Sequence, residues 1–221
     1  MTITPESVRQ SIESDDYGER LSGVTKLGHL DPEVAFPLVQ SLVNDPNPRV
    51  RYSAVSKLAT LGTQDLAVTL ELLRDRLYND SELDVKAAAA DALGALKIRD
   101  AFDDLEKAYH QTSDWILRLS IVAALGEMGE PRAFDILQDA LQSDEDLIVG
   151  AAIGALGEFG DDRAIDLLLP LIDYDDWQIR FRLAQALGRF QGESVTQALQ
   201  KLAADPSEPV SQEAQRFLVS G

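Results

Sequence analysis

The chain has 221 residues, of which 45% are hydrophobic, and its 20 basic and 38 acidic residues leave a formal net charge of −18. Such a charge repels phosphate backbones and anionic lipid surfaces, so we expect no nucleic-acid partner and no membrane insertion. The absence of cysteine excludes disulfides, thiolate catalysis and thioether attachment of a cofactor, and no signal peptide is visible, so we expect a cytoplasmic protein.

A short phrase, a small or basic residue followed by Leu and Gly, recurs along the whole chain. Its third residue falls at positions 28, 59, 94, 126, 157, 188 and 219, in steps of 31, 35, 32, 31, 31 and 31 residues, and the copies at 59 and 219 are degenerate. A fixed period of this length is typical of stacked-repeat solenoids, which bind partners along a curved wall. The Gly permits either a close approach of neighbouring helices or a left-handed exit from the helix.

Residues that are typical of helix starts and ends divide each unit into two helices. Apolar residues recur at steps of three and four, Thr4-Pro5-Glu6 opens the first helix, and Asp stands before most later ones. In chain order we expect helices at 5–13 and 16–29, 32–44 and 48–61, 64–78 and 82–96, 99–111 and 114–128, 131–142 and 145–159, 162–173 and 176–190, and 193–204 and 207–219. The sequence therefore predicts an all-α fold, a right-handed α-solenoid of about seven two-helix repeats in a single array over residues 1–221.

No catalytic or metal-binding pattern is visible. The acidic runs 144–146 and 173–176 lack the Gly and Glu that an EF-hand loop requires at its sixth and twelfth positions, and helix capping explains their acids. The two histidines, His29 and His110, have no carboxylates at a matching spacing. We therefore expect no metal site and identify no catalytic residue.

The repeat resembles the HEAT repeat, specifically the short HEAT-like repeat of the phycobilisome lyase group. The similarity lies in Val50-Arg51-Tyr52-Ser53-Ala54, Val85-Lys86-Ala87-Ala88-Ala89, Leu117-Arg118-Leu119 and Ile179-Arg180-Phe181, which stand at the same distance before each phrase. Within this group, the length and the segments 4–9, 47–52, 120–126 and 152–157 look most like those of the cyanobacterial phycobilisome degradation proteins of the non-bleaching B type.

A basic residue recurs eight positions before the end of the phrase. It is Arg20, Arg51, Lys86, Arg118 and Arg180, and the other two units carry Val149 and Ser211. In HEAT repeats such an Arg commonly binds an Asp of the adjacent unit, which implies a ladder of ion pairs along the stack. Alternatively, some of these guanidinium groups face the groove and hold carboxylates. The two interpretations are compatible.

The two tryptophans occupy equivalent places, 62 residues apart. Trp115 and Trp177 both follow an Asp at the start of a second helix, in Asp-Trp-x-x-Arg motifs at 114–118 and 176–180. A large amphipathic ring there suits contact with a partner or a flat ligand, and a rigid wedge between helices is the alternative. The same surface would include Tyr52, Tyr174, Phe181 and Arg182.

The resemblance implies a protein that helps to dismantle the light-harvesting antenna under nutrient stress. Its partners would be phycobiliprotein subunits, phycocyanin or allophycocyanin, together with a protease or another degradation adaptor. Without cysteine, the chain could hold phycocyanobilin only noncovalently. A bilin has two propionates and a conjugated plane, which suit guanidinium and aromatic groups. The implied site residues are Arg51, Arg118, Arg180 and Arg182 for the propionates, Trp115, Trp177 and Tyr52 for stacking, and Asp114 or Asp176 for the pyrrole nitrogens.

Two other functions stay open at this point. One is a subunit of an E/F-type phycocyanobilin lyase, a true enzyme. The other is a HEAT adaptor or scaffold without pigment chemistry, since HEAT surfaces serve many unrelated functions. Whether the chain detaches the chromophore or only binds it also stays open.

Overall fold

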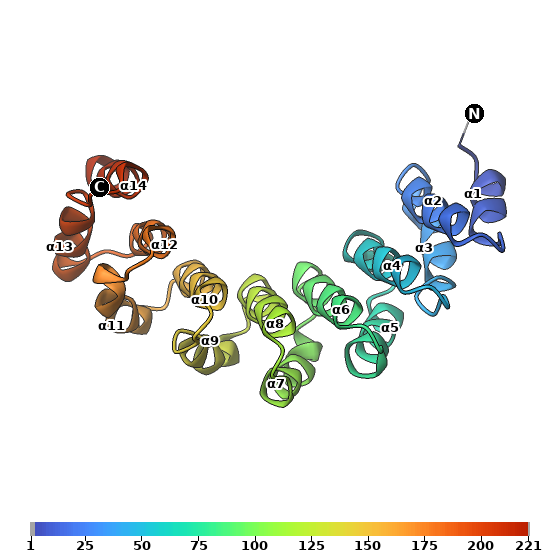
Figure 1. Ribbon diagram of the computed structural model, residues 1–221, viewed down its shortest axis with the longest axis horizontal. Helices are drawn as coiled ribbons and strands as arrows, with labels where there is room; N and C mark the ends of the chain where they lie inside the picture. The colour runs from blue at the N-terminus through green and yellow to red at the C-terminus, as the bar shows by residue number, and fades with distance from the viewer. Residues whose placement is uncertain (1–2, 221) are drawn as a thin grey trace. The chain divides into compact units, whose positions relative to one another are not determined.

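The computed structural model describes residues 3–220, and every regular element in that range is a helix (Figure 1). There are 14 α-helices in the described part of the chain. Their bounds are α1 Pro5–Ile12, α2 Tyr17–Leu27, α3 Pro32–Gln40, α4 Pro48–Leu61, α5 Leu66–Asn79, α6 Leu83–Ala95, α7 Phe102–Gln111, α8 Trp115–Met128, α9 Phe134–Ala140, α10 Asp146–Phe159, α11 Arg163–Leu168, α12 Trp177–Leu187, α13 Glu193–Leu202 and α14 Glu208–Ser220. None of these helices is both long and apolar enough to cross a lipid bilayer.

The helices form the seven predicted hairpins, each made of an odd-numbered first helix and an even-numbered second helix. This confirms the all-α solenoid fold, whereas the right hand of the array stays a prediction. The chain divides into two compact units, residues 1–124 and 125–221, and the boundary lies within α8. Within the first unit α4 packs between α2 and α6, and within the second α12 packs between α10 and α14. The single array over residues 1–221 also stays a prediction.

Local sequence signals fix the helix starts. At the first helix the Ser7 backbone N–H donates to Oγ1 of Thr4 (3.2 Å), and the Thr4 N–H donates to Oγ of Ser7 (2.9 Å). Pro5 follows at the first helical position, where no N–H is needed. This reciprocal cap confirms Thr4 as the predicted N-cap.

The first helices are less regular than the second ones. Three begin with a 3₁₀ turn, at Gly62–Gln64, Arg99–Ala101 and Pro131–Ala133. The helix expected at 162–173 is wrong in its second half, because α11 ends at Leu168 and a 3₁₀ segment runs from Leu169 to Asp173. Pro170 explains the change, since it has no N–H to donate and its ring crowds the preceding turn.

The Gly of the repeated phrase lets second helices touch. A Cβ on Gly94 would lie 2.4 Å from the Cα of Ala124, and one on Gly157 would lie 2.8 Å from the Cα of Ala186. Close approach is therefore the role of these glycines. The left-handed exit falls three residues after Gly157, at Gly160, whose φ is +65°.

Candidate functional site

The loop before each second helix has one recurrent polar position, which we call the loop position. It is occupied by Ser14, Asp45, Asp80, Thr112, Ser143, Tyr174 and Asp205. In the Asp cases one carboxylate oxygen accepts the backbone N–H two residues later, for example Asp80 Oδ1 from Glu82 (3.0 Å) and Asp205 Oδ1 from Ser207 (2.8 Å). The carboxylate is thereby fixed beside the preceding hairpin.

Arg51 makes a bidentate pair with the loop position of the next hairpin. Its Nε and Nη2 donate to the two carboxylate oxygens of Asp80, each at 2.8 Å, and its Nη1 donates to the carbonyl oxygen of Asp45 (3.0 Å). The two side chains are 11% and 1% exposed. The hydrogen bond to Asp80 raises the pKa of Arg51, and although burial opposes ionisation of Asp80, the bond from Arg51 keeps the Asp80 pKa below its ordinary value.

The same pair occurs wherever the next loop position is Asp. Arg20 Nε donates to Asp45 (2.6 Å), and Arg180 Nε donates to Asp205 (2.7 Å). These pairs confirm the predicted ladder for Arg20, Arg51 and Arg180. In each pair the guanidinium N–H groups already donate to acceptors of the protein. Arg51 and Arg180 therefore do not offer the free guanidinium group that was expected to hold a bilin propionate.

The ladder of Arg–Asp pairs is interrupted in the middle of the sequence. The loop positions after Lys86 and Arg118 are Thr112 and Ser143, which carry no charge. Lys86 Nζ donates instead to the carbonyl oxygen of Tyr78 (3.1 Å). Arg118 Nε donates to the carbonyl oxygen of Thr112 (3.0 Å), and its guanidinium lies 5.4 Å from the ring centre of Tyr109, so Arg118 binds within its own hairpin.

The two acids expected to pair with pyrrole nitrogens cap helices. Oδ1 of Asp114 accepts the N–H groups of Ile116 (3.0 Å) and Leu117 (3.1 Å). Oδ1 of Asp176 accepts the N–H of Gln178 (2.6 Å) at the start of α12. Capping accounts for both side chains without a ligand.

Three of the aromatic residues predicted to contact a partner are exposed, whereas Tyr174 and Phe181 are half-buried. Trp115 is 41% exposed, Trp177 44% and Tyr52 48%. Tyr17 on α2 and Leu83 on α6 occupy the same place as the tryptophans, three residues after the loop position, and are also exposed. Sequence reasoning missed these two, although their fixed offset from the loop position could have identified them.

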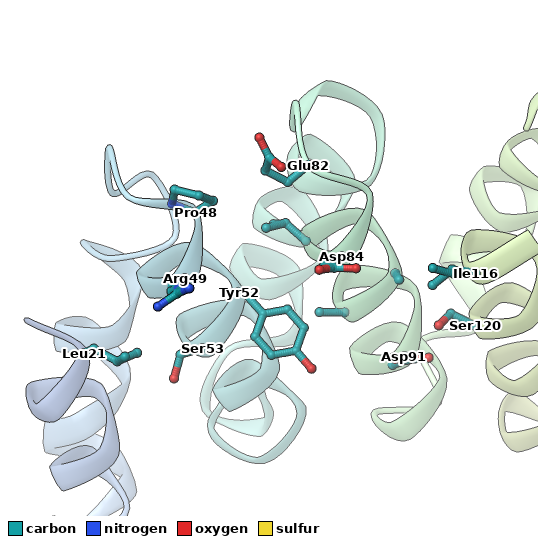
Figure 2. Close-up of a pocket in the computed structure, with 13 residues that line it drawn as sticks. Leu21, Pro48, Arg49, Tyr52, Ser53, Glu82, Asp84, Asp91, Ile116 and Ser120 are labelled. Carbon is teal, nitrogen blue, oxygen red and sulfur yellow. The ribbon is translucent and has the colours of Figure 1, made fainter. Parts of the chain in front are cut away.

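A first cleft of about 720 Å³ lies in the first unit, on the face formed by α2, α4, α6 and α8 (Figure 2). The size of one side chain in each second helix explains this cleft. That residue stands seven positions after the loop position, and we call its place the cleft position. This position carries Tyr52 on α4 and Leu119 on α8, but only Ala87 on α6. The missing side-chain volume on α6 leaves a hollow beside the Tyr52 ring.

The first cleft is acidic. Glu82, Asp84 and Asp91 line it, and Arg49 is its one basic lining residue. Desolvation raises the pKa of the Asp91 carboxyl, and a hydrogen bond with Ser120 offsets part of that effect. A cleft with this charge disfavours propionates.

A second cleft of about 570 Å³ lies in the second unit, on α10, α12 and the start of α14. Trp177, Phe181 and Arg182 of α12 line it. The cleft position on α10 is Gly150, and a Cβ there would lie 3.0 Å from Cδ of Arg182. Gly150 therefore makes room for the aliphatic stem of Arg182 against α10.

The charges of the second cleft are distributed differently. Oδ1 of Asp146 accepts the hydroxyl of Tyr174 (2.7 Å), which together with burial raises the pKa of Tyr174 to about 12. Asp176 caps α12. Within the described range Arg182 makes no hydrogen bond or ion pair, so its guanidinium is the unpaired charge of this cleft. Of the four arginines proposed for propionates, Arg182 is the one that the structure leaves free inside a cleft.

Comparison with known proteins gives the fold family. No curated protein sequence matches this chain. Its structure is similar to a chain in the complex of CpcE and CpcF of phycocyanin lyase from Nostoc sp. PCC7120, with a TM-score of 0.66, 19% identity, and 100% of this chain and 95% of that chain covered. It is also similar to an engineered protein (TM-score 0.65, 18% identity, 99% and 68% covered) and to YibA of Escherichia coli (TM-score 0.65, 12% identity, 99% and 93% covered). A family model of HEAT repeats matches residues 5–94, 70–153 and 150–218, and the chain therefore belongs to the HEAT-repeat family.

Proposed function

We propose that this protein binds phycobiliprotein subunits through the second cleft, on the second helices α10 and α12. The second cleft carries the proposal, because it combines an exposed indole with an unpaired guanidinium, Trp177 and Arg182. The similarity of the whole chain to a component of phycocyanin lyase supports the choice of partner.

The bilin chromophore fits the chemistry of the second cleft. Arg182 would hold a propionate, and Trp177 would stack on the conjugated plane. The cleft volume of about 570 Å³ lies within the range of about 300–1,000 Å³ that is usual for small-molecule sites. Since the chain has no cysteine, the pigment would be held noncovalently.

The biological role that we propose is phycobilisome degradation, with capture of antenna subunits as the step that this chain performs. It rests on the resemblance in the segments 4–9, 47–52, 120–126 and 152–157. A role as a chromophore lyase subunit is the second candidate, favoured by the similarity to the CpcE and CpcF complex.

Incubation with holo-phycocyanin, followed by size-exclusion chromatography with detection of pigment absorbance, tests the proposal. Co-elution of intact holo-subunit supports binding, and release of free pigment adds detachment. Attachment of free phycocyanobilin to apo-phycocyanin in the presence of the chain would instead support the lyase subunit. No co-elution with either phycocyanin or allophycocyanin would refute the proposal.

A paired set of variants locates the binding. Arg182→Gln removes the free guanidinium of the second cleft, and Arg189→Gln removes an exposed guanidinium outside it, whose nearest acid is Glu158 at 3.6 Å. Both variants change the net charge equally. We expect Arg182→Gln to weaken capture about tenfold, as for a charge-assisted contact, and Arg189→Gln to leave capture unchanged.

A further inference from the structure

The first cleft has a chemistry that the proposed function does not use. Its floor includes Val85, Ala87 and Ala88 of α6, and Ile116 of α8 closes one side. Figure 2 shows the Tyr52 side chain projecting from α4 toward α6. An apolar floor beside an exposed ring is suited to hold an aliphatic chain.

Carboxylates on α6 and in the loop before it surround this floor. Asp84 has no ion-pair or hydrogen-bond partner among the described residues, and Glu82 accepts only the hydroxyl of the adjacent Ser81, at 3.3 Å. Asp91 lies about two helical turns further along the same face of α6, beside Ser120 of α8. None of these three carboxylates forms an ion pair among the described residues, so each can still accept a cation: Asp84 has no partner there, and Glu82 and Asp91 bind only the hydroxyl groups of Ser81 and Ser120.

An ammonium or guanidinium group on a long aliphatic stem complements both features. The stem would cover Ala87 and Ile116, and the charged end would reach the carboxylates. The Tyr52 ring, 48% exposed, adds a face for a cation–π contact. The net charge of −18 would steer a cationic partner toward the protein.

We propose that the first cleft is a docking site for a lysine- or arginine-containing segment of a protein partner. The cleft volume of about 720 Å³ is within the range of about 300–1,000 Å³ in which a few side chains can be enclosed. This site is distinct from the second cleft in residues and in charge, so it does not depend on bilin or phycobiliprotein binding.

The test uses a fluorescein-labelled peptide of alternating Lys and Leu and measures its fluorescence anisotropy with the full chain. We expect saturable binding that weakens as salt increases. A matching peptide of alternating Glu and Leu should not bind. Equal binding of both peptides would overturn the proposal, because the cleft would then not select a cation.

Net charge alone would also attract a cationic peptide, so the variants are matched in charge. The cleft variant is Glu82→Gln/Asp84→Asn/Asp91→Asn, and the control variant is Glu13→Gln/Glu33→Gln/Asp100→Asn, at exposed sites outside the cleft. We expect the cleft variant to weaken binding about tenfold, since each exposed charge pair contributes modestly, and the control variant to change it less than about twofold. An equal loss in both would refute the site.

Ala87→Leu tests the hollow without changing any charge. It places at the cleft position of α6 the residue that α8 already has there, Leu119. Because Ala87 lines the cleft, we expect a larger side chain there to fill it, with unchanged helicity by circular dichroism and loss of peptide binding. Retained binding by a folded Ala87→Leu variant, or displacement of the peptide by an equal concentration of spermine, would contradict a docking site for a peptide side chain.

Discussion

The ladder pair of Arg51 and Asp80 provides the sharpest test of how the hairpins are held together. Asp80→Asn keeps an oxygen that can accept the Glu82 N–H but removes the charge that pairs with Arg51 and also with Arg76, whose Nη1 lies 3.1 Å from Oδ2. Removing one partner of a buried ion pair typically costs about 3–5 kcal/mol. Asp80 is 1% exposed, but Arg51 keeps its bond to the carbonyl oxygen of Asp45, so we expect the lower end, about 3 kcal/mol.

The assay is urea unfolding followed by far-UV circular dichroism. Asp173→Asn is the control, because its pair with Lys201 is exposed on both sides and should contribute less than about 1 kcal/mol. Arg51→Met completes a double-mutant cycle, and the double variant should be less destabilised than the sum of the single variants by about 2 kcal/mol. A loss below about 1 kcal/mol for Asp80→Asn, or strict additivity, would refute the reasoning.

Three further predictions concern stability. Gly94→Ala should lower stability by about 2 kcal/mol, since its Cβ meets backbone, whereas Gly154→Ala, with nothing within 4 Å, should raise it by about 0.5–1 kcal/mol; urea midpoints that fall together would contradict this. The hydrogen bond from Arg180 keeps the pKa of Asp205 below its ordinary value of 3.8. The ion pair therefore contributes its full stability above pH 3.8, and this contribution is lost as the pH falls through the lower pKa that Asp205 has in the folded protein. Asp205→Asn should therefore lose stability at neutral pH and match the wild type near about pH 2, and a constant difference in unfolding free energy across that range would be inconsistent with it. Desolvation raises the pKa of Asp91, so the protein loses stability as the pH rises through that raised value and the carboxyl ionises. Asp91→Asn should therefore increase the melting temperature at neutral pH but not at acid pH. A lower melting temperature at neutral pH would contradict this.

The fold followed from the sequence because each level of the pattern agreed with the others. The 31-residue period, the caps such as Thr4-Pro5 and the Gly at the end of the phrase all specify stacked hairpins, and the helices lie where they were expected. Two first helices end earlier than expected. The helix expected at 32–44 ends at Gln40, and in the one expected at 162–173 the internal Pro170 outweighed the apolar spacing.

The site was harder to predict because it depends on pairs of residues in different repeats. Arg51 and Arg118 are alike in sequence, but the residue at the next loop position decides whether such an Arg joins the ladder. The small residue at the cleft position has a different effect in each unit: Ala87 lines the first cleft, whereas the space beside Gly150 is taken by the stem of Arg182. A comparison of the seven repeats position by position would have revealed both rules.

Hydrogen–deuterium exchange with and without holo-phycocyanin tests the central claim most directly. If the second helices bind the partner, exchange should slow at the start of α10 and in the first turns of α12, around Trp177 and Arg182, and stay unchanged in α9 and α11. Slower exchange in α9 or α11 with none in α12, or no change in any helix at saturating partner, would contradict the account.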